Sequence, residues 1–268
     1  MEHVSSRQNA VVKRFRAVAR EGRSGDAVLL DGAHLVDEAL SSGVELETVA
    51  LAAAAAEGRL ADLAARCVAT GARVILVSDN VLGAMSPVHQ PSGIVAVARM
   101  TPATIDAALA AGPPQLVLVL DRIQDPGNVG AIVRAAEACG ATAVLTGPGT
   151  ADPFGWKALR GSMGSAFRLP VAPAGSLEEA MAAARSAGLR IFATVPRGGT
   201  PLAETHLDQP AAILIGGEGT GLPADLVAAA DEPMSIRMRP PVESLNVAIA
   251  AALVLYEATR QRTHVAVR

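Results

Sequence analysis

Aromatic residues are scarce in this sequence. They make up 2% of its 268 residues, whereas hydrophobic residues of all kinds make up 50% and charged residues 18%. This balance is typical of a folded globular chain, and it predicts a core filled by aliphatic side chains. Because so few rings are available for stacking, we do not expect a surface that reads single-stranded bases.

Cysteines and long apolar runs are also few. Cys67 and Cys139 are too few for a disulfide framework, and neither stands in a metal-binding pattern with histidine or a second cysteine. Apolar stretches such as 49–56 and 211–215 are far shorter than a bilayer span, and the N-terminus is polar and basic. We therefore expect a cytoplasmic protein with no membrane segment and no metal.

Charge is unevenly distributed along the chain. The net charge of −3 gives no reason to expect a nucleic-acid partner, but the first helical segment contains only Glu2 and Glu21 as acidic residues among many basic ones. We interpret this segment as a local basic surface. Its cations are Arg7, Lys13, Arg14, Arg16, Arg20 and Arg23.

The hydropathy pattern divides the chain into two domains. In residues 1–100, short aliphatic strands alternate with helical stretches, which predicts a small α/β domain. Residues 101–113 are small and flanked by prolines, so they are predicted to form a linker or a short linking helix. The expected strands are 28–30, 49–51, 74–77 and 93–97, and the expected helices are 34–40 and 60–69.

Residues 114–268 are predicted to form a second α/β domain. Its strands are continuously apolar and separated by helices, which indicates a parallel sheet covered on both faces. Ligands bind such sheets at the carboxyl ends of the strands, so the chemistry is expected there. The expected strands are 115–120, 143–146, 190–194, 211–215 and 234–238, and the expected helices are 131–139, 177–187, 223–230 and 246–262.

Three loops that follow predicted strands carry polar residues and glycines. In the first, Gly127 and Gly130 permit a tight turn, and Arg134 lies one helical turn further on, where it should point toward the loop. The second, 216–222, is dense in glycine and allows a ligand to approach the backbone closely. The third, 239–246, ends at the start of a helix.

Each loop also has a purely structural interpretation. The first can be a simple turn with a helix cap, with Arg134 a solvated charge, and in the third Ser244 can be the N-cap with Leu245 in the core. The glycines of 216–221 match neither the dinucleotide fingerprint nor the P-loop, and no lysine follows them. A nucleotide-dependent oxidoreductase is therefore disfavoured.

Together, the order and spacing of these segments resemble the SpoU (TrmH-like) RNA ribose methyltransferases of the SPOUT superfamily. A segment from Arg160 to Pro170 also resembles the family, and residues 6–13 with Leu30-Asp-Gly32 resemble its attached RNA-binding domain, although Asp31 replaces a commoner Glu. The three motifs are Asp125-Pro-Gly-Asn128-Val-Gly130-Ala-Ile-Val-Arg134-Ala-Ala136, Ile213-Leu-Ile-Gly216-Gly-Glu218-Gly-Thr-Gly221-Leu222, and Ile236-Arg-Met238 through Ser244-Leu-Asn246-Val-Ala248.

The resemblance implies methyl transfer from S-adenosylmethionine to a ribose 2′-hydroxyl of structured RNA. The motifs contain no histidine or lysine to accept the hydroxyl proton. The family instead implies that Arg134 acts near the hydroxyl, either as the base or, still protonated, as a positioning group, and Glu218 is the carboxylate best placed to hold an arginine. The implied active-site positions are Asn128, Arg134, Glu218, Ser244 and Asn246, and the implied methyl-donor contacts are Thr194, Gly216, Ile236, Met238 and Leu245.

The resemblance also implies the architecture and the partners. A small ribosomal L30e-like α/β domain would precede a SPOUT-type parallel sheet with a deep trefoil knot, and two copies would form a homodimer with its sites at the interface. Arg237 and Pro240 stand where Pro and Gly are common, which affects the donor loop. RNA phosphates are expected to bind Arg7, Lys13, Arg14, Arg160 and Arg168.

The RNA substrate is left open by the sequence. The two-domain layout favours 23S rRNA, and tRNA is the alternative. A catalytically silent RNA-binding or ribosome-assembly factor of the same fold is the alternative from another functional class. The presence of all five implied active-site residues argues against a silent protein.

Overall fold

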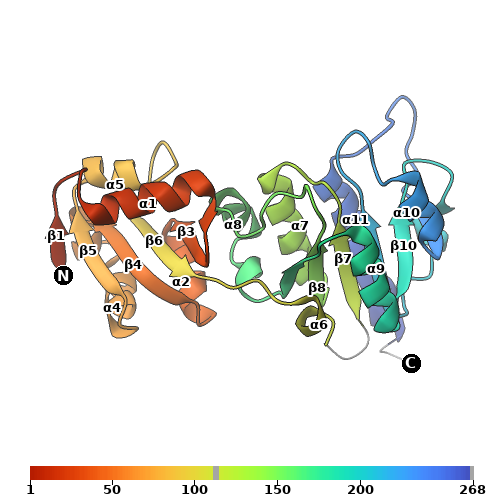
Figure 1. The fold of residues 1–268 in the computed structure, drawn as a ribbon, viewed down its shortest axis with the longest axis horizontal. Coiled ribbons are helices and arrows are strands. Elements are labelled where there is room, and N and C mark those ends of the chain that lie inside the picture. The colour runs from red at the N-terminus through yellow and green to blue at the C-terminus, as the bar shows by residue number, and fades with distance from the viewer. Residues whose placement is uncertain (111–114, 266–268) are drawn as a thin grey trace. The chain divides into compact units, whose positions relative to one another are not determined.

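The chain forms two compact units in a computed structural model that describes residues 1–110 and 115–265 (Figure 1). The first unit comprises residues 1–101 and 154–168, and the second comprises residues 102–153 and the chain from 169 onward. Part of the predicted linker, residues 111–113, lies outside the described residues, and so does Pro114. The remainder of the linker contains the short helix α6 (Ile105–Ala108).

The first unit is built on a six-stranded mixed sheet in the order β1-β5-β4-β6-β3-β2. β5 pairs in parallel with β1 and β4, whereas β6 is antiparallel to β3 and β4. The predicted small α/β domain is thus present. Its strands are β1 (Glu2–Val4), β2 (Arg23–Ser24), β3 (Ala27–Asp31), β4 (Glu45–Ala52), β5 (Arg73–Val77) and β6 (Ile94–Arg99).

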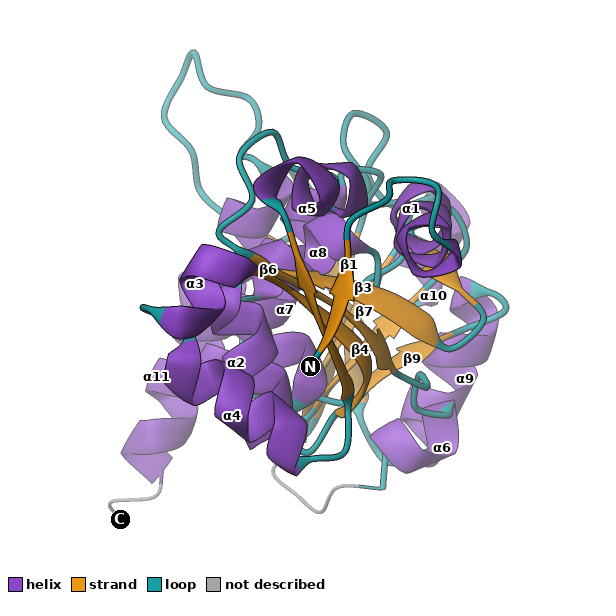
Figure 2. Cartoon of the chain, turned by 90° about the vertical axis from the view of Figure 1, so that its left-hand side faces the viewer, coloured by secondary structure: helices purple, strands orange, loops and turns teal. Residues whose placement is uncertain are grey.

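Helices cover both faces of this sheet (Figure 2). α1 buries Val12, Phe15 and Val18 at a spacing of three residues and packs with α5 on one face, while α2 and α4 lie on the other. Lys13 on the opposite side of α1 stays exposed. The helices are α1 (Ala10–Glu21), α2 (Ala33–Ser41), α3 (Ala53–Glu57), α4 (Ala61–Ala69), α5 (Asp79–Met85), α8 (Trp156–Ser162) and the 3-10 turn η1 (Ser165–Phe167).

The second unit is built on a seven-stranded sheet in the order β11-β13-β10-β12-β7-β8-β9. Every pairing in it is parallel, which confirms the predicted sheet type. The strand predicted at 234–238 instead ends at Ser235, so Ile236 and Met238 leave the sheet. The strands are β7 (Leu116–Leu120), β8 (Ala143–Thr146), β9 (Val171–Pro173), β10 (Arg190–Thr194), β11 (Thr200–Pro201), β12 (Ala211–Ile215) and β13 (Glu232–Ser235).

Helices α6, α9 and α10 pack on one face of this second sheet, and α7 packs against α11 (Figure 1). Among the described residues, no helix is both long and apolar enough to cross a membrane. The helices that follow α6 in this unit are α7 (Pro126–Ala138), α9 (Leu177–Ser186), the 3-10 turn η2 (Leu202–Glu204), α10 (Ala224–Ala229) and α11 (Val247–Val265).

The starts of α7 and α11 differ from the predicted ones. Asp125 caps α7, because its side chain accepts a hydrogen bond from the backbone N–H of Asn128 at 2.9 Å, and Pro126 opens the helix. The prediction that Gly127 and Gly130 form a tight turn is therefore wrong, since both lie inside the helix. Asn246, and not Ser244, caps α11.

Asp31, at the end of β3, is a buried carboxylate with 8% of its surface exposed. Burial raises the pKa of this carboxyl, and a hydrogen bond from Ser86 Oγ at 2.5 Å and the nearby Arg160 guanidinium oppose that shift only in part. The fold thus favours the neutral form. The stability that Asp31 contributes is present below its ordinary pKa of 3.8 and is lost as the pH rises through the raised folded value.

We predict that Asp31→Asn raises the melting temperature at about pH 7 by a few degrees, because each unit of pKa shift corresponds to about 1.4 kcal/mol. At about pH 3.5, where Asp31 is neutral, the gain should vanish. Thermal unfolding followed by circular dichroism measures both values. Asp62→Asn, at an exposed position of α4, is the matched control. An equal gain at both pH values would contradict the prediction.

Candidate functional site

The carboxyl ends of β10, β12 and β13 open into a cavity of about 520 Å³. Parallel register brings these ends together, since Thr194 of β10 pairs with Met234 of β13 and Ala193 with Leu214 of β12. Other walls come from the start of α11 and from Leu202 of η2. The cavity is of the size that holds a small-molecule ligand.

All five predicted methyl-donor contacts line this cavity. The Thr194 hydroxyl donates to the Leu214 carbonyl at 2.9 Å, so this side chain is bound to the neighbouring strand. The backbone N–H groups of Ile236, Met238 and Leu245 make no hydrogen bond within residues 1–110 and 115–265, which leaves them available to a ligand. Leu245 is 37% exposed, so it is not the core residue of the structural interpretation.

The glycine loop after β12 folds back on itself against the cavity. The backbone N–H of Gly221 donates to the Gly217 carbonyl at 3.1 Å. A Cβ atom on Gly216 would lie 2.4 Å from the Leu222 nitrogen and 2.5 Å from the Gly221 carbonyl carbon. Only glycine fits at position 216 without displacing the backbone that forms this wall of the cavity.

Three of the predicted active-site residues form one chain of hydrogen bonds beside the cavity. Asn246 Oδ1 accepts from the backbone N–H groups of Ala248 and Ile249 at 3.0 and 3.3 Å, so its Nδ2 must point away from the helix. That nitrogen donates to Asn128 Oδ1 at 3.2 Å, and Asn128 Nδ2 in turn donates to Glu218 Oε1. The helix cap therefore fixes the orientation of both amides and of the carboxylate.

Arg134 stands apart from this network. It is exposed on α7, does not line the cavity, and makes no hydrogen bond or ion pair with the described part of the chain. Glu218 contacts Asn128 and no arginine among those residues, so the predicted pairing of this carboxylate with an arginine is not formed within one chain. Ser244 lines the cavity beside Leu245.

Two family models match the sequence over most of its length. The SpoU rRNA Methylase family matches residues 115–256, and a domain described as RNA 2'-O ribose methyltransferase substrate binding matches residues 29–104. The chain belongs to the SpoU rRNA Methylase family. It is an RNA 2′-O-ribose methyltransferase that uses S-adenosylmethionine.

Characterised and solved relatives span both units of this SpoU methylase. It is 36% identical to an uncharacterized tRNA/rRNA methyltransferase of Synechocystis sp. over 97% of this chain and 94% of that one. It is 32% identical to the 23S rRNA (guanosine(2553)-2'-O)-methyltransferase RlmP of Bacillus subtilis over 96% and 98%. The AdoMet-bound rRNA methyltransferase from Sinorhizobium meliloti superposes with a TM-score of 0.84 at 30% identity and covers 97% of each chain.

The cavity of this SpoU methylase suits a sulfonium nucleoside. Free backbone N–H groups can bind the polar edge of a purine, while Val247, Ala250 and Val254 of α11 provide an apolar wall. Their spacing of three and four residues follows the helical repeat, so the sequence contained this signal, although our predictions did not use it. Leu202 carried no such signal, because it lies outside every motif.

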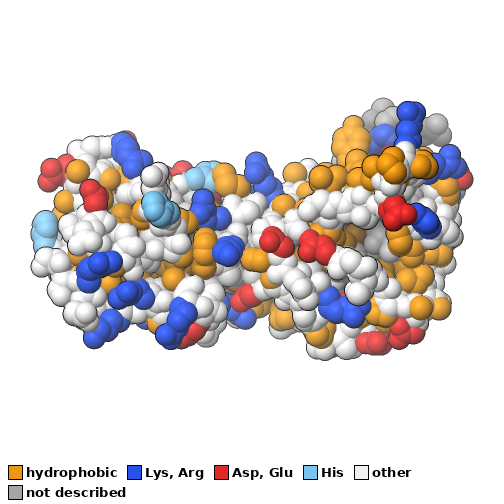
Figure 3. Space-filling model, turned by 90° about the horizontal axis from the view of Figure 1, so that it is seen from above, with side chains coloured by type: hydrophobic (Ala, Val, Ile, Leu, Met, Phe, Trp, Pro, Cys, Tyr) orange, Lys and Arg blue, Asp and Glu red, His pale blue; other side chains and the backbone are white. Residues whose placement is uncertain are grey.

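The predicted RNA-binding residues all lie in the first unit, over which Lys and Arg side chains are widely spread in Figure 3. Arg7 and Lys13 are exposed and have no ion-pair partner among the described residues. Arg14 lies 3.5 Å from Glu47, Arg168 pairs with Glu38, and Arg160 is exposed near Asp31. Arg7 and Lys13 are thus the freest to bind phosphate. In the described ranges, no group of His, Cys, Asp and Glu could hold a metal ion.

We predict that Gly216→Ala weakens the binding of S-adenosylhomocysteine at least about tenfold, since backbone displacement at a tight site costs a kcal/mol or more. Isothermal titration calorimetry measures the affinity, and the melting temperature shows whether the fold survives. Gly83→Ala is the matched control, because a Cβ atom there meets nothing within 4 Å. Unchanged affinity in Gly216→Ala would exclude the donor from this cavity.

Proposed function

We propose that this chain methylates a ribose 2′-hydroxyl in 23S rRNA, with the methyl donor in the cavity at the ends of β10, β12 and β13. The observation that carries the proposal is the junction of this cavity with the Asn246–Asn128–Glu218 hydrogen-bond chain. A donor site and a polar substrate site adjoin there. The similarity to RlmP, which spans both units, favours 23S rRNA over tRNA.

Glu218 is the residue that we expect to orient the substrate hydroxyl. Bound S-adenosylmethionine supplies a methyl group that is activated by the positive sulfur. One oxygen of Glu218 is held by Asn128, and the other contacts no side chain among the described residues. The free oxygen of Glu218 can accept a hydrogen bond from the ribose hydroxyl. This bond would direct the hydroxyl oxygen toward the methyl group. Asn128 and Asn246 act by holding this carboxylate in place.

An exposed apolar stripe on α11 supports a homodimer. Ile249, Leu253 and Tyr256 repeat at the helical spacing and are 55%, 42% and 66% exposed. Large apolar side chains that line up on one exposed helix face mark an interaction surface. The helix also lines the cavity, through Val247, Ala250 and Val254 on a different face, so a partner on this stripe would lie close to the donor site.

We infer that Arg134 completes the site of the partner subunit. Six residues separate it from Asn128 on α7, which places the two side chains about 9 Å apart along the axis and about 120° apart around it. Arg134 therefore cannot join the Asn128 cluster from the same helix face. It instead shares an exposed face with the small residues Gly127 and Ala131, on a helix that packs against α11.

The remaining expectations of the resemblance stand as proposals. RNA phosphates would bind the predicted cations of the first unit, which are Arg7, Lys13, Arg14, Arg160 and Arg168. The cavity loops that follow β12 and β13 are the segments that a trefoil knot would bring together. The predicted domain boundaries at 100 and 114 and the cytoplasmic location stay predictions.

We predict that Arg134→Ala and Arg134→Lys both abolish methylation, because either change removes the planar guanidinium. Mapping 2′-O-methylation in total RNA from cells without the gene, and from the same cells complemented with each variant, measures this. One 23S rRNA position should lose its methyl group and regain it only with the wild-type chain. Loss at a tRNA position would support the alternative substrate, and no loss anywhere would support the silent RNA-binding factor. Arg185→Ala, at an exposed position of α9, is the control and should retain methylation.

We predict that Leu253→Glu converts the dimer to a monomer, because it places a charge in the apolar stripe. Light scattering after size exclusion measures the mass. Val68→Glu, at an exposed apolar position of α4, should leave the mass unchanged.

If Arg134 acts across the dimer, mixing Arg134→Ala chains with Gly216→Ala chains should raise the activity above that of either variant alone, because one site of each mixed dimer is then intact. No recovery from mixed dimers would place Arg134 in its own subunit's site.

A further inference from the structure

One wall of the donor cavity belongs to a segment with little regular structure of its own. Leu202, which lines the cavity, begins η2 just after the two-residue strand β11. From there the chain runs through Thr205 and Leu207 toward β12. So short a strand and a single 3-10 turn cannot by themselves hold a side chain against a ligand.

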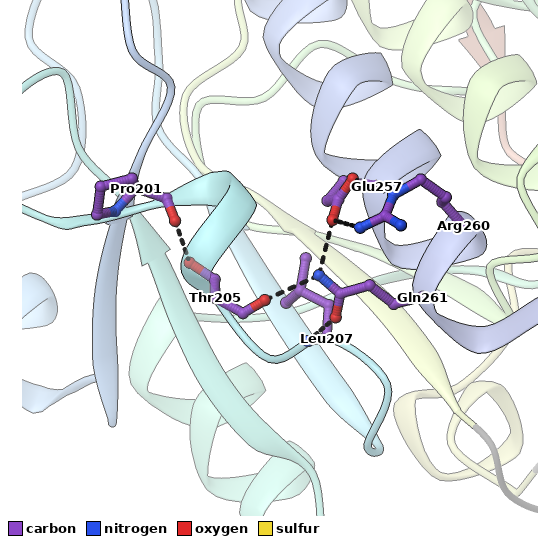
Figure 4. Close-up of polar contacts among 6 residues, drawn as sticks. All are labelled: Pro201, Thr205, Leu207, Glu257, Arg260 and Gln261. Atoms are coloured by element: carbon purple, nitrogen blue, oxygen red, sulfur yellow. Dashed lines mark hydrogen bonds and ion pairs between the residues drawn. The ribbon is translucent and has the colours of Figure 1, made fainter. Parts of the chain in front are cut away.

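The far end of α11 binds this segment (Figure 4). Gln261 Oε1 accepts a hydrogen bond from the Leu207 backbone N–H at 2.7 Å, and its Nε2 donates to the Thr205 carbonyl at 2.9 Å and to Glu257 Oε1 at 2.8 Å. The backbone N–H can only donate and the carbonyl can only accept, so the orientation of this amide is fixed. A single side chain thus binds both ends of the peptide stretch that follows η2.

The backbone that Gln261 binds is buried, and other hydrogen bonds extend the contact. Thr205 and Leu207 are 1% and 0% exposed, and the Thr205 hydroxyl donates to the Pro201 carbonyl at 3.2 Å, immediately before Leu202. Arg262 adds hydrogen bonds to the carbonyls of Leu207 at 2.9 Å and Gln209 at 2.6 Å. Part-buried hydrogen bonds to backbone hold it more firmly than an exposed ion pair does.

An ion pair also connects the loop that follows β13 to η2. Arg237 lies 2.7 Å from Glu204, but both side chains are largely exposed, at 76% and 60%. Water screens such a pair, so it adds little to the positioning of Leu202. The hydrogen bonds of Gln261 are therefore a stronger restraint on this wall of the cavity than the ion pair is.

We propose that Gln261 is a positioning residue for the methyl donor: it holds residues 202–207 so that Leu202 closes the cavity against the bound nucleoside. The inference rests on the proposed placement of the donor in this cavity. α11 then serves the donor site at both ends, through Asn246 at its N-terminus and through Gln261 about four turns later.

The test uses the full-length chain with Gln261→Met, which keeps the length of the side chain and removes its hydrogen bonds. We expect the affinity for S-adenosylhomocysteine to fall about tenfold, because the substitution removes hydrogen bonds whose net contribution is close to that of one typical bond. Amide hydrogen exchange in the ligand-free protein should accelerate in 202–207 and not in β10 or β12. Thr263→Ala is the control, since its hydroxyl bonds only to Thr259 of the same helix.

Unchanged affinity alongside accelerated exchange would overturn the proposal. Leu202→Ala gives an independent test should Gln261→Met fail to fold, because wild-type affinity in Leu202→Ala would also overturn it. In the chain that carries both Gln261→Met and Leu202→Ala, the two losses of affinity should not add. Full additivity would show that the residues act separately.

If Gly216→Ala weakens binding of S-adenosylhomocysteine and Gln261→Met does not, only this inference fails. If neither does, the donor site itself lies elsewhere.

Discussion

Parallel pairing of β10 with β12 and β13 is the constraint on which the rest of the site depends. It brings the ends of three strands, far apart in the sequence, to one edge of the sheet, where each continues into a loop. The loop after β12 can form its wall of the cavity because glycine at 216 lets this loop fold back on itself. Without this register, the donor contacts would lie at different heights along the sheet.

Helix α11 joins the parts of this SpoU methylase that must act together. Its cap, Asn246, fixes the amide of Asn128 and so the carboxylate of Glu218, while its first turns form the apolar wall of the cavity. Its exposed stripe is the surface that we propose for a second copy, and its last turns bind the segment after Leu202 through Gln261. Substitutions at Asn246, in the first turns or at Gln261 are therefore expected to affect the site, although part of this helix lies outside the sequence motifs.

The mode of RNA binding follows from what the surface contains. The first unit presents arginines and lysines, several of them on one side of α1, and the chain has few aromatic side chains to stack on bases. Phosphate contacts of this kind position an RNA by its shape and do not read its sequence. In the proposed mechanism, the choice of nucleotide then depends on how the folded RNA presents one ribose to Glu218.

Local patterns in the sequence determined the two α/β units, the parallel sheet, and the bounds of β8, β10 and β12, because continuous apolar runs between helices have few other solutions. The family motifs led to the five cavity contacts. Tertiary structure decided where α7 and α11 begin, since the caps at Asp125 and Asn246 depend on side-chain direction. It also decided that Glu218 bonds to Asn128 and not to an arginine, and that Gln261 reaches Leu207. Such contacts join residues distant in the chain, and no local spacing encodes them.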